Sequence, residues 1–132
     1  PKTISDWQEA GEKALASLLR KARKTPGVGS LGPRASWKAE LRMVSGAVMT
    51  GLNSRYRGKR MPTDVLSFPA PAVFARQGIL GELVICVPVM KRQARELGHD
   101  PTRELSVLLA HGLLHLLGLD HERLTYRYQG RE

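Results

Sequence analysis

The sequence predicts a single α+β domain, residues 1–132, in which a small sheet is flanked by helices as a mixed α/β sandwich. The length of 132 residues suits one hydrophobic core. The hydrophobic fraction of 42% is ordinary for a globular protein. Segments with helical periodicity alternate with short β-type runs along the chain, which favours helices packed on a sheet.

The N-terminal half opens with a helix. Ser5 and Gln8 resemble a capping box ahead of apolar residues at helical spacing, which predicts a helix over residues 6–24. Glycines and prolines then mark a loop over 25–36. Alternating polar and apolar residues predict a strand over 40–44. We expect the next elements to be a helix over 46–56, strands over 63–68 and 81–87, a loop over 70–80 and a helix over 90–97.

The last helix has the clearest signals. Asp100 can cap it, Pro101 suits its first position and Gly118 ends it. Its apolar residues cover nearly every side, which predicts a buried, central helix. The apolar stretch 105–119 is too short and too interrupted by polar residues to cross a bilayer, so we expect no membrane partner. The order of the strands is not predicted.

Charge and cysteine content narrow the function classes. Lys and Arg total 21 against 12 Asp and Glu, a net charge of +9, which favours a polyanion such as nucleic acid; a solvated basic surface is the alternative. The only cysteine, Cys86, lies in an apolar run and is interpreted as a buried core thiol. With no secretory signal visible at the start, we expect a cytoplasmic protein.

A group of histidines in the last helix predicts a metal site. His111 and His115 lie four residues apart, so their rings share one helical face, and two imidazoles there can meet one ion at about 2.0–2.1 Å. Gly118 permits a turn that could bring His121 to the same ion. Three histidines with an open fourth position suit catalytic zinc. The alternative is a hydrogen-bonded pair of core histidines, and His99 is interpreted as a surface or loop residue.

The neighbours of these histidines argue against a peptidase. Zinc peptidases carry a glutamate base directly after the first histidine, where this chain has Gly112. Asp120 could orient His121 or contact the water on the metal, or it could bond only its own backbone turn. Glu104 shares the helical face of His111, and a solvated glutamate in the first turn is the preferred interpretation.

At this motif, residues 111–121, the sequence resembles the YbeY family of bacterial rRNA-maturation endoribonucleases. Leu119 stands where that family usually has an aromatic residue. A second block, residues 52–59 followed by 62–69, and a third, residues 81–85, also resemble the family, in the family's order. The resemblance implies a zinc-binding fold that cleaves single-stranded RNA, in maturation of the 3′ end of small-subunit (16S) rRNA and in ribosome quality control.

The resemblance also assigns roles. The functional arginine of the family corresponds to Arg57, which suits bidentate contact with a phosphate. Its partners would be small-subunit rRNA and ribosomal proteins. We therefore expect one Zn²⁺ per chain on the three histidines, Arg57 and Asp120 as catalytic residues, and RNA backbone contacts from Arg55, Lys59 and Arg60. Two alternatives remain open: a zinc-stabilised RNA-binding assembly factor without turnover, and a metal-dependent hydrolase of another substrate.

Overall fold

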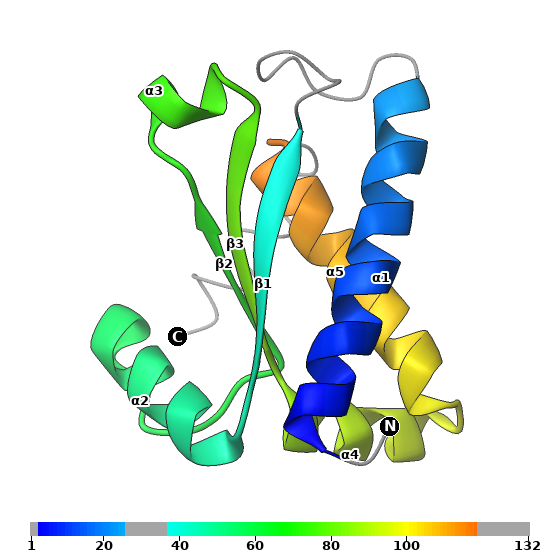
Figure 1. Ribbon diagram of the computed structural model, residues 1–132. Helices are drawn as coiled ribbons and strands as arrows, with labels where there is room; N and C mark the ends of the chain where they lie inside the picture. The colour runs from blue at the N-terminus through cyan, green and yellow to red at the C-terminus, as the bar shows by residue number, and fades with distance from the viewer. Residues whose placement is uncertain (1–2, 26–36, 119–132) are drawn as a thin grey trace.

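The computed structural model describes residues 3–25 and 37–118, and these residues form a three-stranded sheet with helices on both faces (Figure 1). The strand order is β1-β3-β2. β1 (Lys38–Val44) pairs with β3 (Ile79–Cys86) in parallel, and β2 (Val65–Pro69) pairs with β3 antiparallel. The predicted α+β class is confirmed. Within this part of the chain, no helix combines the length and apolarity needed to cross a membrane.

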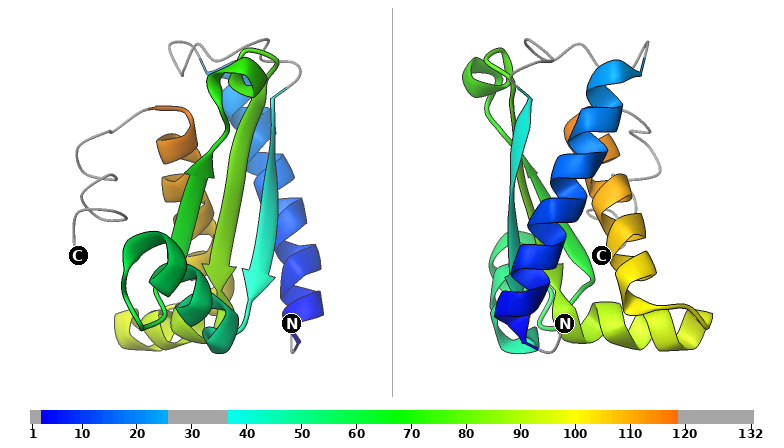
Figure 2. Two further views of the ribbon diagram at one scale, coloured as in Figure 1. Left: turned by 90° about the vertical axis from the view of Figure 1, so that its left-hand side faces the viewer. Right: turned by 45° about the vertical axis from the view of Figure 1, so that its right-hand side comes forward.

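The helices form layers around the sheet (Figures 1 and 2). α1 (Ile4–Lys24) and α5 (Pro101–Leu116) cover one face, which we call the inner face, and α2 (Gly46–Arg57) lies on the opposite, outer face. α4 (Val87–Leu97) lies across the end of the sheet, and the short α3 (Ala72–Ala75) lies in the β2–β3 connection. The predicted elements are confirmed with ends shifted by up to about three residues, while the predicted loop residues 26–36 lie outside the described part.

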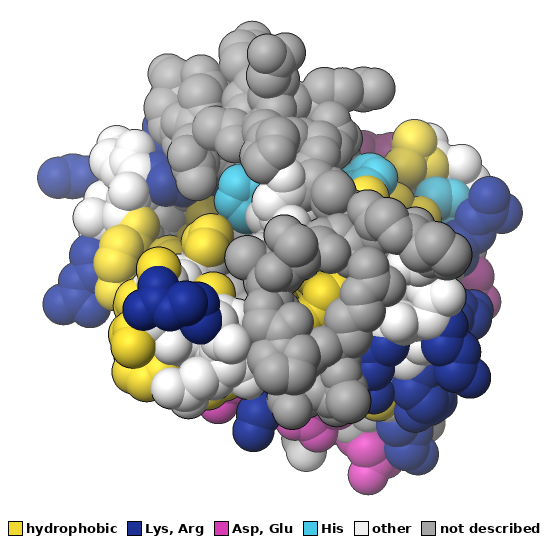
Figure 3. Space-filling model, turned by 90° about the horizontal axis from the view of Figure 1, so that it is seen from above, with side chains coloured by type: hydrophobic (Ala, Val, Ile, Leu, Met, Phe, Trp, Pro, Cys, Tyr) yellow, Lys and Arg dark blue, Asp and Glu magenta, His cyan; other side chains and the backbone are white. Residues whose placement is uncertain are grey.

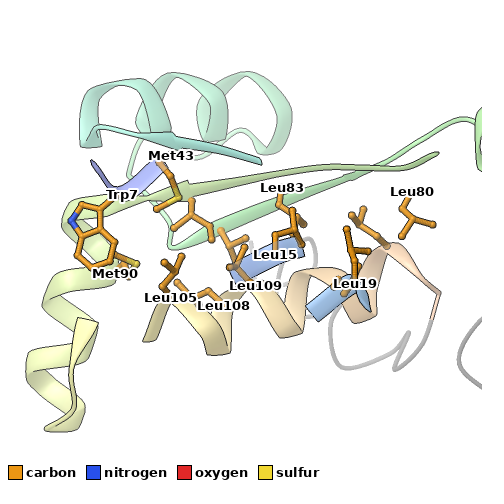
Figure 4. Packing of buried hydrophobic residues seen from close by; sticks show 14 of the residues in the cluster. Trp7, Leu15, Leu19, Met43, Leu80, Leu83, Met90, Leu105, Leu108 and Leu109 are labelled. Atoms are coloured by element: carbon orange, nitrogen blue, oxygen red, sulfur yellow. The ribbon is translucent and has the colours of Figure 1, made fainter. Parts of the chain in front are cut away.

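The main core lies between the sheet and the helices α1 and α5 (Figure 4). Leu83 and Ile85 of β3 point into it, and the intervening Val84 and Cys86 point into a smaller cluster under α2. This alternation buries both faces of the central strand and explains its nearly continuous apolar run. Cys86 is buried as predicted, and this burial raises the pKa of its thiol.

The predicted capping box of α1 is wrong. Thr3 is the N-cap: its hydroxyl accepts from the Asp6 backbone N–H at 3.0 Å, and Asp6 accepts in return from the Thr3 N–H. Gln8 instead binds the edge of β1. Its Nε2 donates to the Leu41 carbonyl at 2.8 Å and its Oε1 accepts from the Met43 N–H at 2.8 Å, satisfying backbone groups that an edge strand leaves open.

The predicted loop 70–80 is also wrong in part, because it contains α3 and the start of β3. The β2–β3 connection closes as a hairpin in which the Ala70 N–H donates to the Leu80 carbonyl at 3.0 Å. Inside it, Pro71 starts a four-residue helix. One helical turn is too short to produce a recognisable apolar period, which is why the sequence pattern missed it.

The junction of α4 and α5 corrects the interpretation of Glu104 as solvated. Glu104 is 3% exposed, and its Oε1 lies 2.7 Å from Nε2 of His99. Gly98 ends α4 in the predicted left-handed conformation (φ 74°), which turns His99 back toward the first turn of α5. A histidine partner makes burial of this carboxylate tolerable, and sequence spacing gave no indication of the pair.

We expect His99→Ala to lower the free energy of unfolding by about 2 kcal/mol, because it leaves the Glu104 carboxylate buried without its partner. Urea unfolding of a double-mutant cycle with Glu104→Ala measures the coupling. The double variant should be less destabilised than the sum of the single variants. Additive losses would show that the two side chains do not interact.

Candidate functional site

The predicted histidine pair lies together on the flank of α5. Gly112 faces the sheet, since a Cβ atom placed there would lie 2.7 Å from Cδ2 of Leu83. Successive residues of a right-handed helix turn by about 100°, so His111 and His115 share one side, toward β2, and Leu113 lies on the side toward α1. Both histidines are half-buried. The spacing prediction of one shared face is consistent with this arrangement.

The end of α5 has the predicted turn. The Leu117 N–H donates to the Leu113 carbonyl at 2.9 Å, and the Gly118 N–H donates to the His115 carbonyl at 3.0 Å. Gly118 then takes a left-handed conformation (φ 76°) that a side chain would disfavour. The helix therefore ends within three residues of His115 at a left-handed glycine, which suits a third ligand from the following segment.

Two of the predicted site residues, His121 and Asp120, lie outside the described residues. Among residues 3–25 and 37–118, no group of three or more His, Cys, Asp or Glu side chains is placed to hold a metal. What this part supplies is two imidazoles one helical turn apart, next to a left-handed glycine at the end of the helix. Such a donor pair fits a zinc ion that takes further ligands from elsewhere.

Gly112 has a structural reason for being glycine. The position faces the fully buried Leu83 rather than the histidine side of α5. A glutamate here would direct its carboxylate into the core. The helix therefore cannot present the peptidase base at this position without disturbing the packing of α5 on β3.

Arg57 lies in the last turn of α2, on the outer face of the sheet. It is half-buried, and its Nη1 is shielded from solvent. Gly58 ends the helix in a left-handed conformation (φ 72°). The buried Asn53 then holds the following turn: its side-chain Nδ2 donates to the Met61 carbonyl at 2.8 Å, and its backbone carbonyl accepts from the Lys59 N–H at 3.3 Å. Asn53 holds this turn in place, and sequence reasoning did not single it out, because its burial and its bond to Met61 depend on how the turn folds back on α2.

The predicted RNA-contacting residues surround Arg57. Arg55 and Arg60 are exposed and Lys59 is half-buried, all from the end of α2 and the turn after it. In the view of Figure 3, histidine side chains reach the surface, and Lys and Arg side chains gather toward the rim. The basic group and the histidine pair come from opposite faces of the sheet. Both lie beside β2, an edge strand of the described sheet.

Comparisons with a family model and with curated proteins all point to one family. The family model described as "Endoribonuclease YbeY" matches residues 3–128. A relative from Frankia casuarinae with this description is 39% identical, covering 89% of this chain and 59% of its own length. One from Moorella thermoacetica is 40% identical, covering 85% of this chain and 76% of its own length. One from Aquifex aeolicus is 53% identical, covering 54% of this chain and 48% of its own length.

The chain thus spans about half to three quarters of the length of these curated relatives. Among solved structures, the solution structure of TM1509 from Thermotoga maritima superimposes with a TM-score of 0.59 at 28% identity. The match covers 92% of this chain and 71% of that one. The fold is therefore shared over nearly all of the sequence.

Proposed function

Because the chain belongs to the YbeY endoribonuclease family, we propose that it is a zinc-dependent endoribonuclease that cleaves single-stranded RNA. The proposed setting is maturation of the 3′ end of 16S rRNA and ribosome quality control in the cytoplasm, with small-subunit rRNA and ribosomal proteins as partners. The observation that carries the proposal is the pair His111 and His115 on one side of α5, followed by the left-handed turn at Gly118.

In this proposal the chain is one domain that holds one Zn²⁺ through His111, His115 and His121. An all-imidazole set suits zinc, and three protein ligands leave a position for water or substrate. When bound, the ion supplies Lewis-acid polarisation of a phosphate oxygen and lowers the pKa of bound water to about 7. Asp120, which directly precedes the third ligand, would orient His121.

Arg57 would bind the phosphate and offset the charge that develops on it. Its guanidinium can donate two parallel hydrogen bonds to phosphate oxygens. The shielding of its Nη1 from solvent strengthens such an interaction, since water screens it less. Gly58 ends α2, and Asn53 holds the turn that follows. Together they would fix the direction from which Arg57 reaches the substrate. Arg55, Lys59 and Arg60 would bind neighbouring phosphates.

The second candidate is a zinc-stabilised assembly factor that binds RNA without cleaving it. The packing of Gly112 on Leu83 supports this alternative, because it removes the protein base that zinc peptidases use at that position. A hydrolase of another substrate is less well supported, because the net charge of +9 and the basic group around Arg57 favour a phosphate ligand.

We expect Arg57→Ala to lower the initial rate of cleavage of a labelled single-stranded RNA by about 10²-fold, the usual effect of removing one transition-state donor. Arg95→Ala is the matched control, because Arg95 also lies in the last turn of a helix that ends in a left-handed glycine. Its rate should stay at the wild-type level. Equal rates for Arg57→Ala and wild type would show that Arg57 has no role in the mechanism. If wild type binds the RNA without cleaving it, the assembly-factor alternative is favoured.

A further inference from the structure

An exposed aromatic ring lies within the basic group around Arg57. Tyr56 precedes Arg57 in the last turn of α2, and its ring centroid lies 5.1 Å from that of Phe68 on β2 at an interplanar angle of 66°. This edge-to-face contact is a favourable aromatic geometry. Tyr56 is nevertheless 58% exposed. The contact with Phe68 therefore orients the ring while leaving much of it open to a ligand.

The elements on either side hold this pair in place. Phe68 lies on the outer face of the sheet, packed against the cluster that contains Leu66 and Val84. Its backbone is in register with Glu82 of β3, so it is part of the sheet. α2 is fixed by its Ser45 cap and its left-handed Gly58. Ordering the Tyr56 ring on binding would therefore cost less conformational entropy than ordering a ring on a loop.

Cations flank the ring. The run 55–60, Arg-Tyr-Arg-Gly-Lys-Arg, contains no acidic residue. Arg55 and Arg60 are exposed, and in the described part of the chain neither forms an ion pair with a carboxylate. Phe74 on α3 is also exposed, at 47%, but its neighbours in α3 are the apolar residues Ala72, Val73 and Ala75. Within residues 3–25 and 37–118, only Tyr56 combines an oriented ring with cations on both sides in sequence.

We propose that Tyr56, supported by Phe68, stacks on an unpaired RNA base while Arg55 and Arg60 bind the adjoining phosphates. Single strands offer unstacked bases, and proteins bind them with aromatic rings in positively charged grooves. This base-binding subsite lies beside β2 on the outer face, across the edge strand from the histidine side. This inference rests on the part of the proposed function that makes RNA the ligand. It does not require that the protein cleaves the RNA.

The test compares the affinity of wild type, Tyr56→Leu, Tyr56→Phe and Tyr56→Trp for a short labelled single-stranded RNA and for an abasic RNA of equal length. Fluorescence anisotropy on ice gives Kd, and a gel verifies that the RNA stays intact. Tyr56→Leu should raise the Kd for normal RNA about 5- to 150-fold, the range for loss of one stacked base. Tyr56→Phe and the control Phe74→Leu should stay within about twofold of wild type.

Abasic RNA is the decisive ligand. Wild type should bind it about as weakly as Tyr56→Leu binds normal RNA, and Tyr56→Leu should bind both RNAs alike. In Tyr56→Trp, the indole emission should be quenched by normal RNA and not by abasic RNA. Unchanged thermal unfolding of Tyr56→Leu shows that the fold is intact.

Three results would overturn the subsite. These are an unchanged Kd in Tyr56→Leu, an equal loss of affinity for normal and abasic RNA in that variant, and equal quenching of the Tyr56→Trp indole by the two RNAs. Cleavage assays on the same samples distinguish failure of the base-binding subsite from failure of the proposed nuclease function. Base-dependent binding without cleavage supports the subsite and contradicts the nuclease, whereas cleavage with an unchanged Kd in Tyr56→Leu does the reverse.

Discussion

The His115→Ala variant is expected to lose its zinc and about 10³-fold of the ribonuclease rate. His115 lies one helical turn from His111 on the side of α5 toward β2, and the left-handed Gly118 follows three residues later. Removing the middle ligand would leave two histidines, too few for stable zinc at ordinary concentrations. A bound ion contributes several kcal/mol to transition-state stabilisation, and about 4 kcal/mol corresponds to the predicted factor.

Metal content by mass spectrometry and the initial rate on labelled RNA measure the two effects. His99→Gln is the control. It removes a histidine between α4 and α5 that is not a predicted zinc ligand, and the glutamine amide can still donate a hydrogen bond to Glu104. It should retain one zinc per chain and the wild-type rate. A His115→Ala protein that keeps its zinc would show that the histidine pair is a structural feature of α5.

The second large effect is expected on stability. Gly112→Glu should lower the free energy of unfolding by about 3–5 kcal/mol, because it places an unpartnered carboxylate against Leu83 in the core. That is a large part of the 5–15 kcal/mol typical of a whole domain. Urea unfolding followed by circular dichroism measures it.

Ser106→Glu, on an exposed position of the same helix, should change stability by less than about 0.5 kcal/mol. The pair of variants also tests the argument against a peptidase. A stable Gly112→Glu protein that cleaved peptides would show that position 112 faces the metal side of α5, contrary to its packing on β3.

Much of the fold could be predicted from local signals. α5 was predicted from Asp100, Pro101 and Gly118, because caps act on their own helix and need no long-range information. The strand order and the burial of Glu104 could not be predicted. Both depend on which segments pack together, and the partner of Glu104 comes from the end of the preceding helix.

The candidate site divides in the same way. The shared face of His111 and His115 follows from helical period alone. The position of Arg57 on the outer face, opposite the histidine face, depends on the β1-β3-β2 order, which no local pattern encodes. The Tyr56–Phe68 contact likewise requires α2 to pack on that face, so the sequence pattern did not single out Tyr56.

Removal and return of zinc test the central claim most directly. Purified wild-type protein is freed of metal with a chelator, assayed on labelled single-stranded RNA, and assayed again after one equivalent of Zn²⁺ is added; His115→Ala is carried through the same steps to reveal contaminating ribonuclease. The metal-nuclease account predicts that cleavage stops, that zinc restores it in wild type, and that His115→Ala stays inactive. Cleavage that persists without metal, or that zinc restores equally in His115→Ala, would contradict the account.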